Sequence, residues 1–192
     1  MLSQRIVAVL TLNHGVLTRT KRFRPDYRYT QTQIDLWDCD EVIILDITRG
    51  GDPDFLAAAS RIADAAFVPV TLGGGIRALD DVKRYFDAGA DKITVNTGAL
   101  CNPGLIGDIA RKWGNQSIVL SIDADSNGEV WHSCATVKTG WDYLDWAKRG
   151  EAEGIGEILF TPIDKDGSLT GYATDKLKDL AAAVKVPVIA LG

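Results

Sequence analysis

The residue best suited to acid-base chemistry is an aspartate at the end of an apolar segment. Asp123 closes the segment Ile118–Asp123, whose other residues are apolar or small. A carboxyl group at the end of a buried strand is partly removed from water, which raises its pKa and suits it to general acid or base catalysis. Capping of a neighbouring backbone amide is the structural alternative. Thr11 stands at the matching position of the first apolar segment, so these two positions do not supply a pair of carboxylates.

A run of three glycines has the composition of an anion-binding turn. Gly73–Gly75 follows an apolar segment and precedes a helix, so its backbone amides and the helix N-terminus could bind a phosphate. A plain tight turn is the alternative. Asn96 and Thr97, at the end of the next apolar segment, would add side-chain donors. We therefore predict a first phosphate site formed by Gly75, Asn96 and Thr97.

Residues in the second half of the chain indicate a second anion pocket. Asp166 and Gly167 follow a later apolar segment, and Gly192 follows the last one. An ordinary Asp-Gly turn would explain the first two residues equally well. If both pockets exist, the substrate carries a phosphate at each end. We call Asp166, Gly167 and Gly192 the second phosphate site, and we count Asp46, at the end of a further segment, among the candidate substrate-binding residues.

Four charged residues stand immediately before apolar segments instead of after them. They are Arg5, Glu41, Lys92 and Glu157. The residues that precede parallel strands gather at the edge opposite the chemistry, so we expect these four to form a charged ring with both signs represented. Solvated salt bridges of little energetic value are the simplest interpretation. A gate over a passage along the axis of the sheet is the functional interpretation.

Short apolar segments alternate with longer amphipathic ones along the whole chain, which is typical of β-α units around a parallel sheet. The predicted strands are Ile6–Leu12, Val42–Ile47, Val68–Leu72, Ile93–Asn96, Ile118–Asp123, Ile158–Thr161 and Val186–Leu191. The predicted helices are Thr32–Asp38, Pro53–Ala65, Leu79–Ala88, Pro103–Lys112, Tyr143–Glu153 and Thr174–Val184. We expect a mobile loop over Val16–Thr30, which is basic and without periodicity. Ser126–Val137 contains an Asn-Gly turn and predicts an inserted hairpin.

The first three predicted strands resemble the last three. Glu41–Ile47 returns as Glu157–Ile163, and Val68–Gly74 returns as Val186–Gly192. A four-strand unit used twice gives eight strands, so we predict one domain, residues 1–192, with an α/β fold: a (β/α)8 TIM barrel with a twofold half-barrel repeat. An open doubly wound sheet would need no such repeat. The chain stops at Gly192, so we expect the barrel to be truncated after its seventh strand.

Composition and charge argue against several classes of function. The 192 residues carry a net charge of −5, so the overall field repels a nucleic acid backbone. No segment reaches the roughly 20 apolar residues of a membrane span. Cys39, Cys101 and Cys134 are widely spaced and odd in number, which argues against disulfides and a zinc site and fits a reducing cytoplasm. We expect neither a metal nor an organic cofactor.

With these residues identified, the chain resembles the cyclase subunit of imidazole glycerol phosphate synthase over all 192 residues. The resemblance implies a cytoplasmic lyase of histidine biosynthesis, of the glutamine amidotransferase type. Ammonia from a docked glutaminase would attack a bisphosphorylated ribulosyl aminoimidazole nucleotide, giving imidazole glycerol phosphate and aminoimidazole carboxamide ribotide. The segments that carry the resemblance are Arg5–Leu10, Leu45–Thr48, Gly73–Ile76, Gly89–Thr97, Ser121–Ala124, Gly156–Leu159 and Ile163–Gly167.

The resemblance also implies roles for individual residues. Asp123 matches one of the family's two catalytic aspartates, and the charged ring matches the gate through which ammonia enters. The first and second phosphate sites would hold the two ends of the substrate. Arg19 stands where the family has a basic residue near the substrate.

Position 11 departs from the family pattern. The second catalytic aspartate belongs there, and its replacement by Thr11 would slow cyclisation by about 10²–10⁴-fold. The segment Phe23–Tyr29 resembles a paralogous branch associated with surface-sugar amidation. Three hypotheses therefore stand. They are a cyclase that uses Asp123 with Thr11 or water replacing the missing acid, a non-cyclising barrel that docks a glutaminase and delivers ammonia to a sugar amidotransferase, and a bisphosphate-binding sugar isomerase.

Overall fold

Seven parallel strands form the centre of the structure, a computed structural model that describes residues 4–29 and 39–192. They lie in the order β11-β10-β7-β6-β5-β4-β1. Their bounds are β1 Val7–Asn13, β4 Glu41–Asp46, β5 Val70–Gly73, β6 Lys92–Val95, β7 Ile118–Ala124, β10 Glu157–Pro162 and β11 Val188–Ala190. All seven predicted strands are confirmed, with ends that differ by at most two residues.

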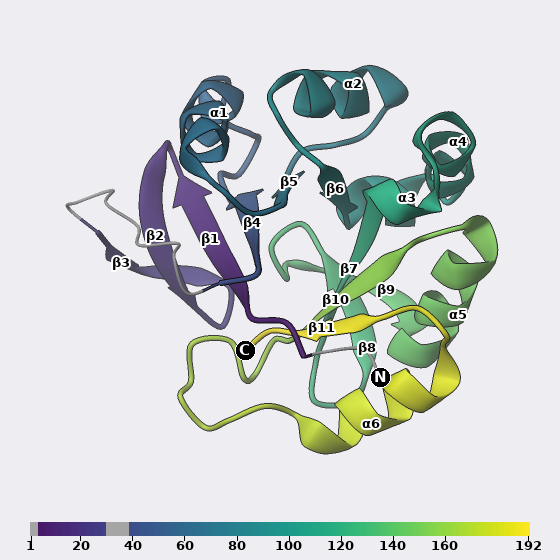
Figure 1. Ribbon diagram of the computed structural model, residues 1–192. Coiled ribbons are helices and arrows are strands. Elements are labelled where there is room, and N and C mark those ends of the chain that lie inside the picture. The colour runs from purple at the N-terminus through teal and green to yellow at the C-terminus, as the bar shows by residue number, and fades with distance from the viewer. Residues whose placement is uncertain (1–3, 30–38) are drawn as a thin grey trace.

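Helices cover the outer face of this curled sheet (Figure 1). Their bounds are α1 Phe55–Ala65, α2 Leu79–Asp87, α3 Thr97–Cys101, α4 Gly104–Trp113, α5 Tyr143–Glu153 and α6 Thr174–Ala183, with a 3-10 turn over Asn115–Ser117. Five of the predicted helices are confirmed, and the short α3 was not predicted. The helix predicted over Thr32–Asp38 lies outside the described residues.

The segment after β1 is a hairpin and not a loop, so the prediction for Val16–Thr30 was wrong over most of its length. Strand β2, Val16–Lys21, pairs with β1, and β3, Arg24–Arg28, pairs antiparallel with β2. The turn between β2 and β3 is made by Arg22 and Phe23, both with left-handed backbone angles (φ 51° and 59°). Strand β3 is exposed throughout, which explains the absence of an apolar period in its sequence.

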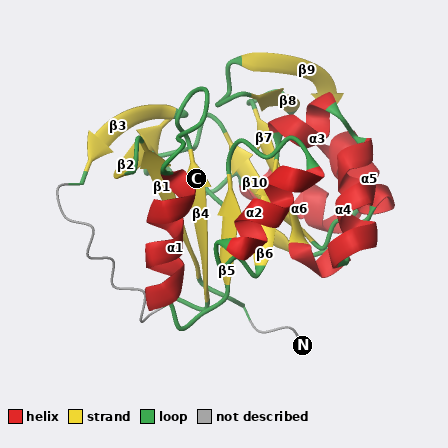
Figure 2. Ribbon diagram, turned by 90° about the horizontal axis from the view of Figure 1, so that it is seen from above, coloured by secondary structure: helices red, strands yellow, loops and turns green. Residues whose placement is uncertain are grey.

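The predicted hairpin after β7 is confirmed, with an additional strand. The Asn127-Gly128 turn joins β7 to β8, Glu129–His132, and β8 pairs antiparallel with β9, Val137–Asp142. Gly128 has φ 88°, as such a turn requires. Figure 2 shows the hairpins β2-β3 and β8-β9 at the same end of the sheet. They therefore flank the carboxyl ends of the parallel strands.

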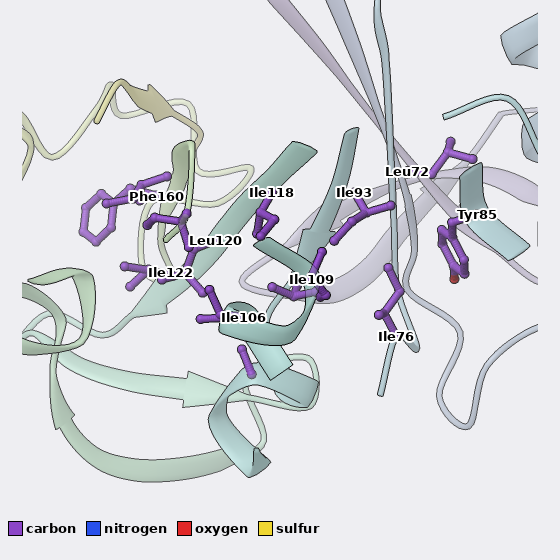
Figure 3. Close-up of a cluster of buried hydrophobic side chains, with 14 of the residues drawn as sticks. Leu72, Ile76, Tyr85, Ile93, Ile106, Ile109, Ile118, Leu120, Ile122 and Phe160 are labelled. Atoms are coloured by element: carbon purple, nitrogen blue, oxygen red, sulfur yellow. The ribbon is translucent and has the colours of Figure 1, made fainter. Parts of the chain in front are cut away.

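The five central parallel strands, β4, β5, β6, β7 and β10, are largely buried on both faces, which explains their unbroken apolar runs. Ile44 and Leu72 point outward into the large core between sheet and helices, part of which is drawn in Figure 3. A smaller cluster fills the inside of the curled sheet. It consists of Ile43, Val119, Leu159 and Ile189, with Val7, Val9, Leu45 and Leu191 packed against it.

An α/β sheet that curls around its own apolar interior, with helices outside, is the arrangement of a TIM-like barrel. In the described residues β11 is paired only with β10, and β1 with β4 and β2. The internal repeat and the truncation remain predictions. Among residues 4–29 and 39–192, no helix combines the length and the apolar character needed to cross a bilayer.

Candidate active site

A cavity of about 640 Å³ opens at the carboxyl ends of the parallel strands, between the two hairpins. Most of the predicted site residues line it, although they come from six different strand ends. Those in the lining are Thr11, Asp46, Gly75, Asn96, Thr97, Asp123 and Asp166. Arg19, Gly167 and Gly192 lie outside the lining.

Asp123 is the most perturbed carboxyl group of the cavity. Only 7% of the residue is exposed. Burial, assisted by the negative charge of Asp166, raises its pKa to about 7 against the opposing hydrogen bonds from Ser121 and Asn96. The Asn96 amide donates to Oδ2 at 2.8 Å, and the Ser121 hydroxyl lies 3.4 Å from Oδ1. Asp123 therefore exists in both protonation states near neutral pH, as a general acid-base group requires.

Thr11 lines the same cavity as Asp123, but its hydroxyl points toward the first hairpin. Its hydroxyl donates a hydrogen bond to the backbone carbonyl of Thr18 in β2. An alcohol of this kind does not ionise near neutral pH. Position 11 therefore stabilises the hairpin, and Asp123 has no carboxylate partner at that position.

The first phosphate site combines a turn with the beginning of a short helix. Gly74 and Gly75 both have left-handed backbone angles (φ 110° and 69°). A side chain on Gly74 would lie 2.5 Å from the carbonyl oxygen of Asp46, whereas Gly75 faces open space. Thr97 begins α3, and its Oγ1 accepts a hydrogen bond from the amide of Ser133 in the β8-β9 turn. The turn therefore leaves room for an anion beside Gly75.

The carboxylate of the second phosphate site is engaged by the first hairpin. Asp166 Oδ1 accepts from the Thr20 hydroxyl at 3.0 Å, and Oδ2 accepts from the Phe23 amide at 2.8 Å. Gly167, with φ 61°, packs so closely that a side chain there would lie 2.2 Å from the carbonyl oxygen of Thr20. Gly192 lies beside Lys165. Asp166 thus fastens the hairpin over the cavity.

The two remaining substrate-binding candidates have structural partners. The Asp46 carboxylate accepts from the amides of Thr48 and Asp52, at 2.8 and 2.9 Å, and so shapes the loop after β4. Arg19 forms an ion pair with Asp26 on the neighbouring strand β3. Its side chain is about half exposed (51%) on the hairpin.

The four residues of the charged ring meet at the opposite end of the sheet. Lys92 lies 3.0 Å from both Glu41 and Glu157, and Arg5 contacts Glu41 and lies 3.2 Å from Glu157. The carboxylates are largely buried (8% and 11% exposed side chains), whereas Arg5 reaches the solvent (34%). Each carboxylate therefore contacts both cations, and each cation contacts both carboxylates.

Three polar residues alternate along the chain between the charged ring and the cavity. Lys92 and Thr94 share the inner face of β6, and Asn96 follows directly after the strand. Within the described part of the chain, Glu157 Oε2, Thr94 Oγ1 and Asn96 Oδ1 are buried polar atoms without a hydrogen-bond partner. Unsatisfied buried groups of this kind can receive a small polar molecule.

Sequence reasoning missed several residues of the cavity. Ser121 was recoverable, because it lies two residues before Asp123 and so shares its face of β7. Cys134 also lines the cavity, and it sits in a turn where Ser133, Cys134 and Ala135 all have φ near 55°. No sequence signal indicated that this turn reaches the loop after β4, where the Cys134 sulfur lies 3.8 Å from the Ile47 carbonyl oxygen.

Comparison with known proteins gives a consistent family. Residues 7–192 match the family described as Histidine biosynthesis protein. A relative from Pyrobaculum aerophilum, named imidazole glycerol phosphate synthase subunit HisF, is 46% identical over 158 residues, which cover 80% of this chain and 62% of the relative. Two further relatives carry the same name. The one from a Hydrogenobaculum species is 40% identical over 204 residues, which cover 100% of this chain and 81% of the relative. The one from Streptococcus sanguinis is 41% identical over 160 residues, which cover 80% of this chain and 64% of the relative.

The aligned regions span less than two thirds of the relatives from P. aerophilum and S. sanguinis. The match to the family nevertheless extends from β1 to the last residue of the chain and includes both the cavity and most of the charged ring. The chain therefore belongs to the histidine biosynthesis protein family and is similar to its HisF subunits.

Proposed function

We propose that this chain is the cyclase subunit of imidazole glycerol phosphate synthase. It takes ammonia from a glutaminase partner and converts a bisphosphorylated ribulosyl aminoimidazole nucleotide to imidazole glycerol phosphate and aminoimidazole carboxamide ribotide. The observation that carries the proposal is Asp123, a buried carboxyl group with a pKa of about 7 that lines the cavity at the carboxyl ends of the strands. A cytoplasmic location belongs to the same proposal.

Asp123 is the proton carrier in this reaction. Ring closure requires protons to leave the attacking nitrogen and to reach the departing group. A carboxyl group with a pKa near 7 can perform either transfer at neutral pH. Asn96, which donates to Oδ2, keeps the ionised form oriented toward the cavity.

Gly75, Asn96 and Thr97 hold one phosphate of the substrate, and the region of Asp166, Gly167 and Gly192 holds the other. The open space at Gly75 supports the first assignment. In the second, the Asp166 carboxylate orders the hairpin, so backbone amides and not this side chain would contact the phosphate. Arg19 and Asp46 act in the same way, by shaping the hairpin and the loop that border the substrate.

The charged ring is the entrance for ammonia from a glutaminase docked on that end of the sheet. Ammonia is uncharged, so it can cross the apolar layer formed by Ile43, Val119 and Leu159, whereas an ammonium ion would be penalised by desolvation. The unpaired atoms Glu157 Oε2 and Thr94 Oγ1 can each contact it on the way. This route supports a heterodimer in which the glutaminase covers the ring.

Turnover with ammonium salt and the ribulosyl nucleotide tests the proposal without a glutaminase. We expect the purified protein to consume the nucleotide, and Thr11→Asp to accelerate consumption by supplying a second carboxylate. An inactive parent that gains activity only through Thr11→Asp would show that the natural protein is not a cyclase. If neither the parent nor the Thr11→Asp variant consumes the nucleotide, the proposal is also contradicted.

A second candidate is a barrel that has lost cyclisation but still delivers ammonia to a sugar amidotransferase in surface polysaccharide synthesis. The specific observation in its favour is the Thr11 hydroxyl, which binds the hairpin and leaves Asp123 without its partner acid. An inactive parent restored by Thr11→Asp would favour this candidate. Copurification of the protein with a glutaminase and a sugar amidotransferase would then test it directly.

A further inference from the structure

A buried tyrosine contacts the backbone of the glycine turn from outside the sheet. Tyr85 lies on α2, is only 6% exposed, and packs against Phe55 of α1 with ring centroids 6.0 Å apart. It belongs to the hydrophobic cluster drawn in Figure 3. Its hydroxyl donates a hydrogen bond to the carbonyl oxygen of Gly74. The aromatic ring therefore serves the core, and its polar end reaches the site.

This hydrogen bond determines the direction of the next backbone amide. The peptide bond between Gly74 and Gly75 is trans, so its carbonyl and its N–H lie in one plane and point in opposite directions. The carbonyl is turned outward to Tyr85 on α2, and the Gly75 N–H is therefore turned inward, where Gly75 lines the cavity. Among the described residues, this N–H has no hydrogen-bond partner.

Without the hydrogen bond from Tyr85, the glycine turn could adopt many other backbone conformations. Two consecutive glycines have the widest choice of backbone angles of any dipeptide. Gly74 is confined on one side by the Asp46 backbone, but Gly75 faces open space. Burial raises the pKa of the Tyr85 hydroxyl well above its usual range, so this group remains a proton donor at every physiological pH.

We propose that Tyr85 is a positioning residue for anion binding: by holding the Gly74 carbonyl, it aims the Gly75 amide at a phosphate group of the substrate. The inference rests on the phosphate site of the proposed function and adds to it a residue on the outer layer of the fold. Preorganised amides bind anions more tightly than amides that must first be ordered.

The test is a titration of the 15N-labelled protein with inorganic phosphate, in which the amide signal of Gly75 is followed by NMR. Tyr85→Phe removes only the hydroxyl. We expect it to need about two- to tenfold more phosphate than the parent, the effect of one hydrogen bond. Tyr143→Phe is the control, because Tyr143, on the distant helix α5, is equally buried (6%) but packs against Phe160 of β10. It should titrate like the parent.

The outcomes separate this role from a purely structural one. Tyr85→Phe should lose more thermal stability than Tyr143→Phe, because of these two hydroxyls only that of Tyr85 has a hydrogen-bond partner among the described residues. Only Tyr85→Phe should weaken phosphate binding. Tyr85→Leu, which also lacks the hydroxyl, must show the same weakening. Equal titration midpoints for the parent and the Tyr85 variants would overturn the proposal, as would a Gly75 signal that phosphate does not move. A responsive Gly75 in a protein without turnover would reject the cyclase and leave this role standing.

Discussion

Replacing Lys92 by methionine should destabilise the protein through the charged ring. Lys92 is 17% exposed and lies 3.0 Å from two carboxylates that are 8% and 11% exposed. Methionine retains most of the side-chain volume but removes the charge, so Glu41 and Glu157 share only Arg5. Breaking a buried ion pair costs about 3–5 kcal/mol. Because Arg5 remains and is partly solvated, we expect a loss of about 2–4 kcal/mol in the free energy of unfolding.

Urea denaturation at neutral pH measures this loss. Lys83→Met is the control, because Lys83 pairs with Asp87 on the exposed face of α2 at 2.6 Å, with side chains 64% and 61% exposed. An exposed pair of this kind should contribute less than about 0.5 kcal/mol. Adding Glu157→Gln to Lys92→Met should recover part of the loss by removing one unpaired charge. Equal destabilisation by Lys92→Met and Lys83→Met would refute the reasoning that the ring is a buried, mutually dependent unit.

Three further predictions follow from the site and its surroundings. Because folding raises the pKa of Asp123 to about 7, the folded state binds more protons than the unfolded state between pH 4 and 7. The free energy of unfolding should therefore fall by about 2–4 kcal/mol as pH rises through that range. Urea midpoints at pH 5 and 8 should show this fall in the parent, and the Asp123→Asn variant should lack this component. Asp166→Ala should release the first hairpin, and hydrogen exchange of the Phe23 amide should accelerate at least tenfold while exchange in β7 stays unchanged. Gly98→Ala places a methyl group 2.1 Å from the Ile76 carbonyl oxygen and should lower the free energy of unfolding by more than about 2 kcal/mol. Gly104→Ala, whose nearest neighbour is 3.4 Å away, should leave the free energy of unfolding unchanged.

The parallel sheet was predictable because its central strands are largely buried on both faces and therefore form short apolar runs in the sequence. Asp123 and Asn96 were predictable as neighbours, since the ends of parallel strands gather at one edge of a sheet. The charged ring was predictable for the same reason at the other edge. Position along a strand thus contained most of the information about the site.

The first hairpin was not predictable in this way. All residues of β3 are exposed, so no apolar period marks the strand. The hairpin is fastened by Asp166, whose contact with Thr20 joins residues that are 146 positions apart in the chain. The same contact gives Asp166 a structural role, as the anchor of the hairpin, beside its proposed place in the second phosphate site. The role of Tyr85 was not predictable from the sequence, because an aromatic residue on an amphipathic helix normally indicates only core packing.

Ammonium-dependent turnover of the ribulosyl nucleotide by the parent and by Asp123→Asn tests the central claim most directly. The side chain of asparagine has a similar size but carries no titratable proton. If Asp123 is the proton carrier of the cavity, turnover should fall by about 10²–10⁴-fold, while phosphate still shifts the Gly75 amide signal. An Asp123→Asn protein that turns over at the rate of the parent would contradict the account.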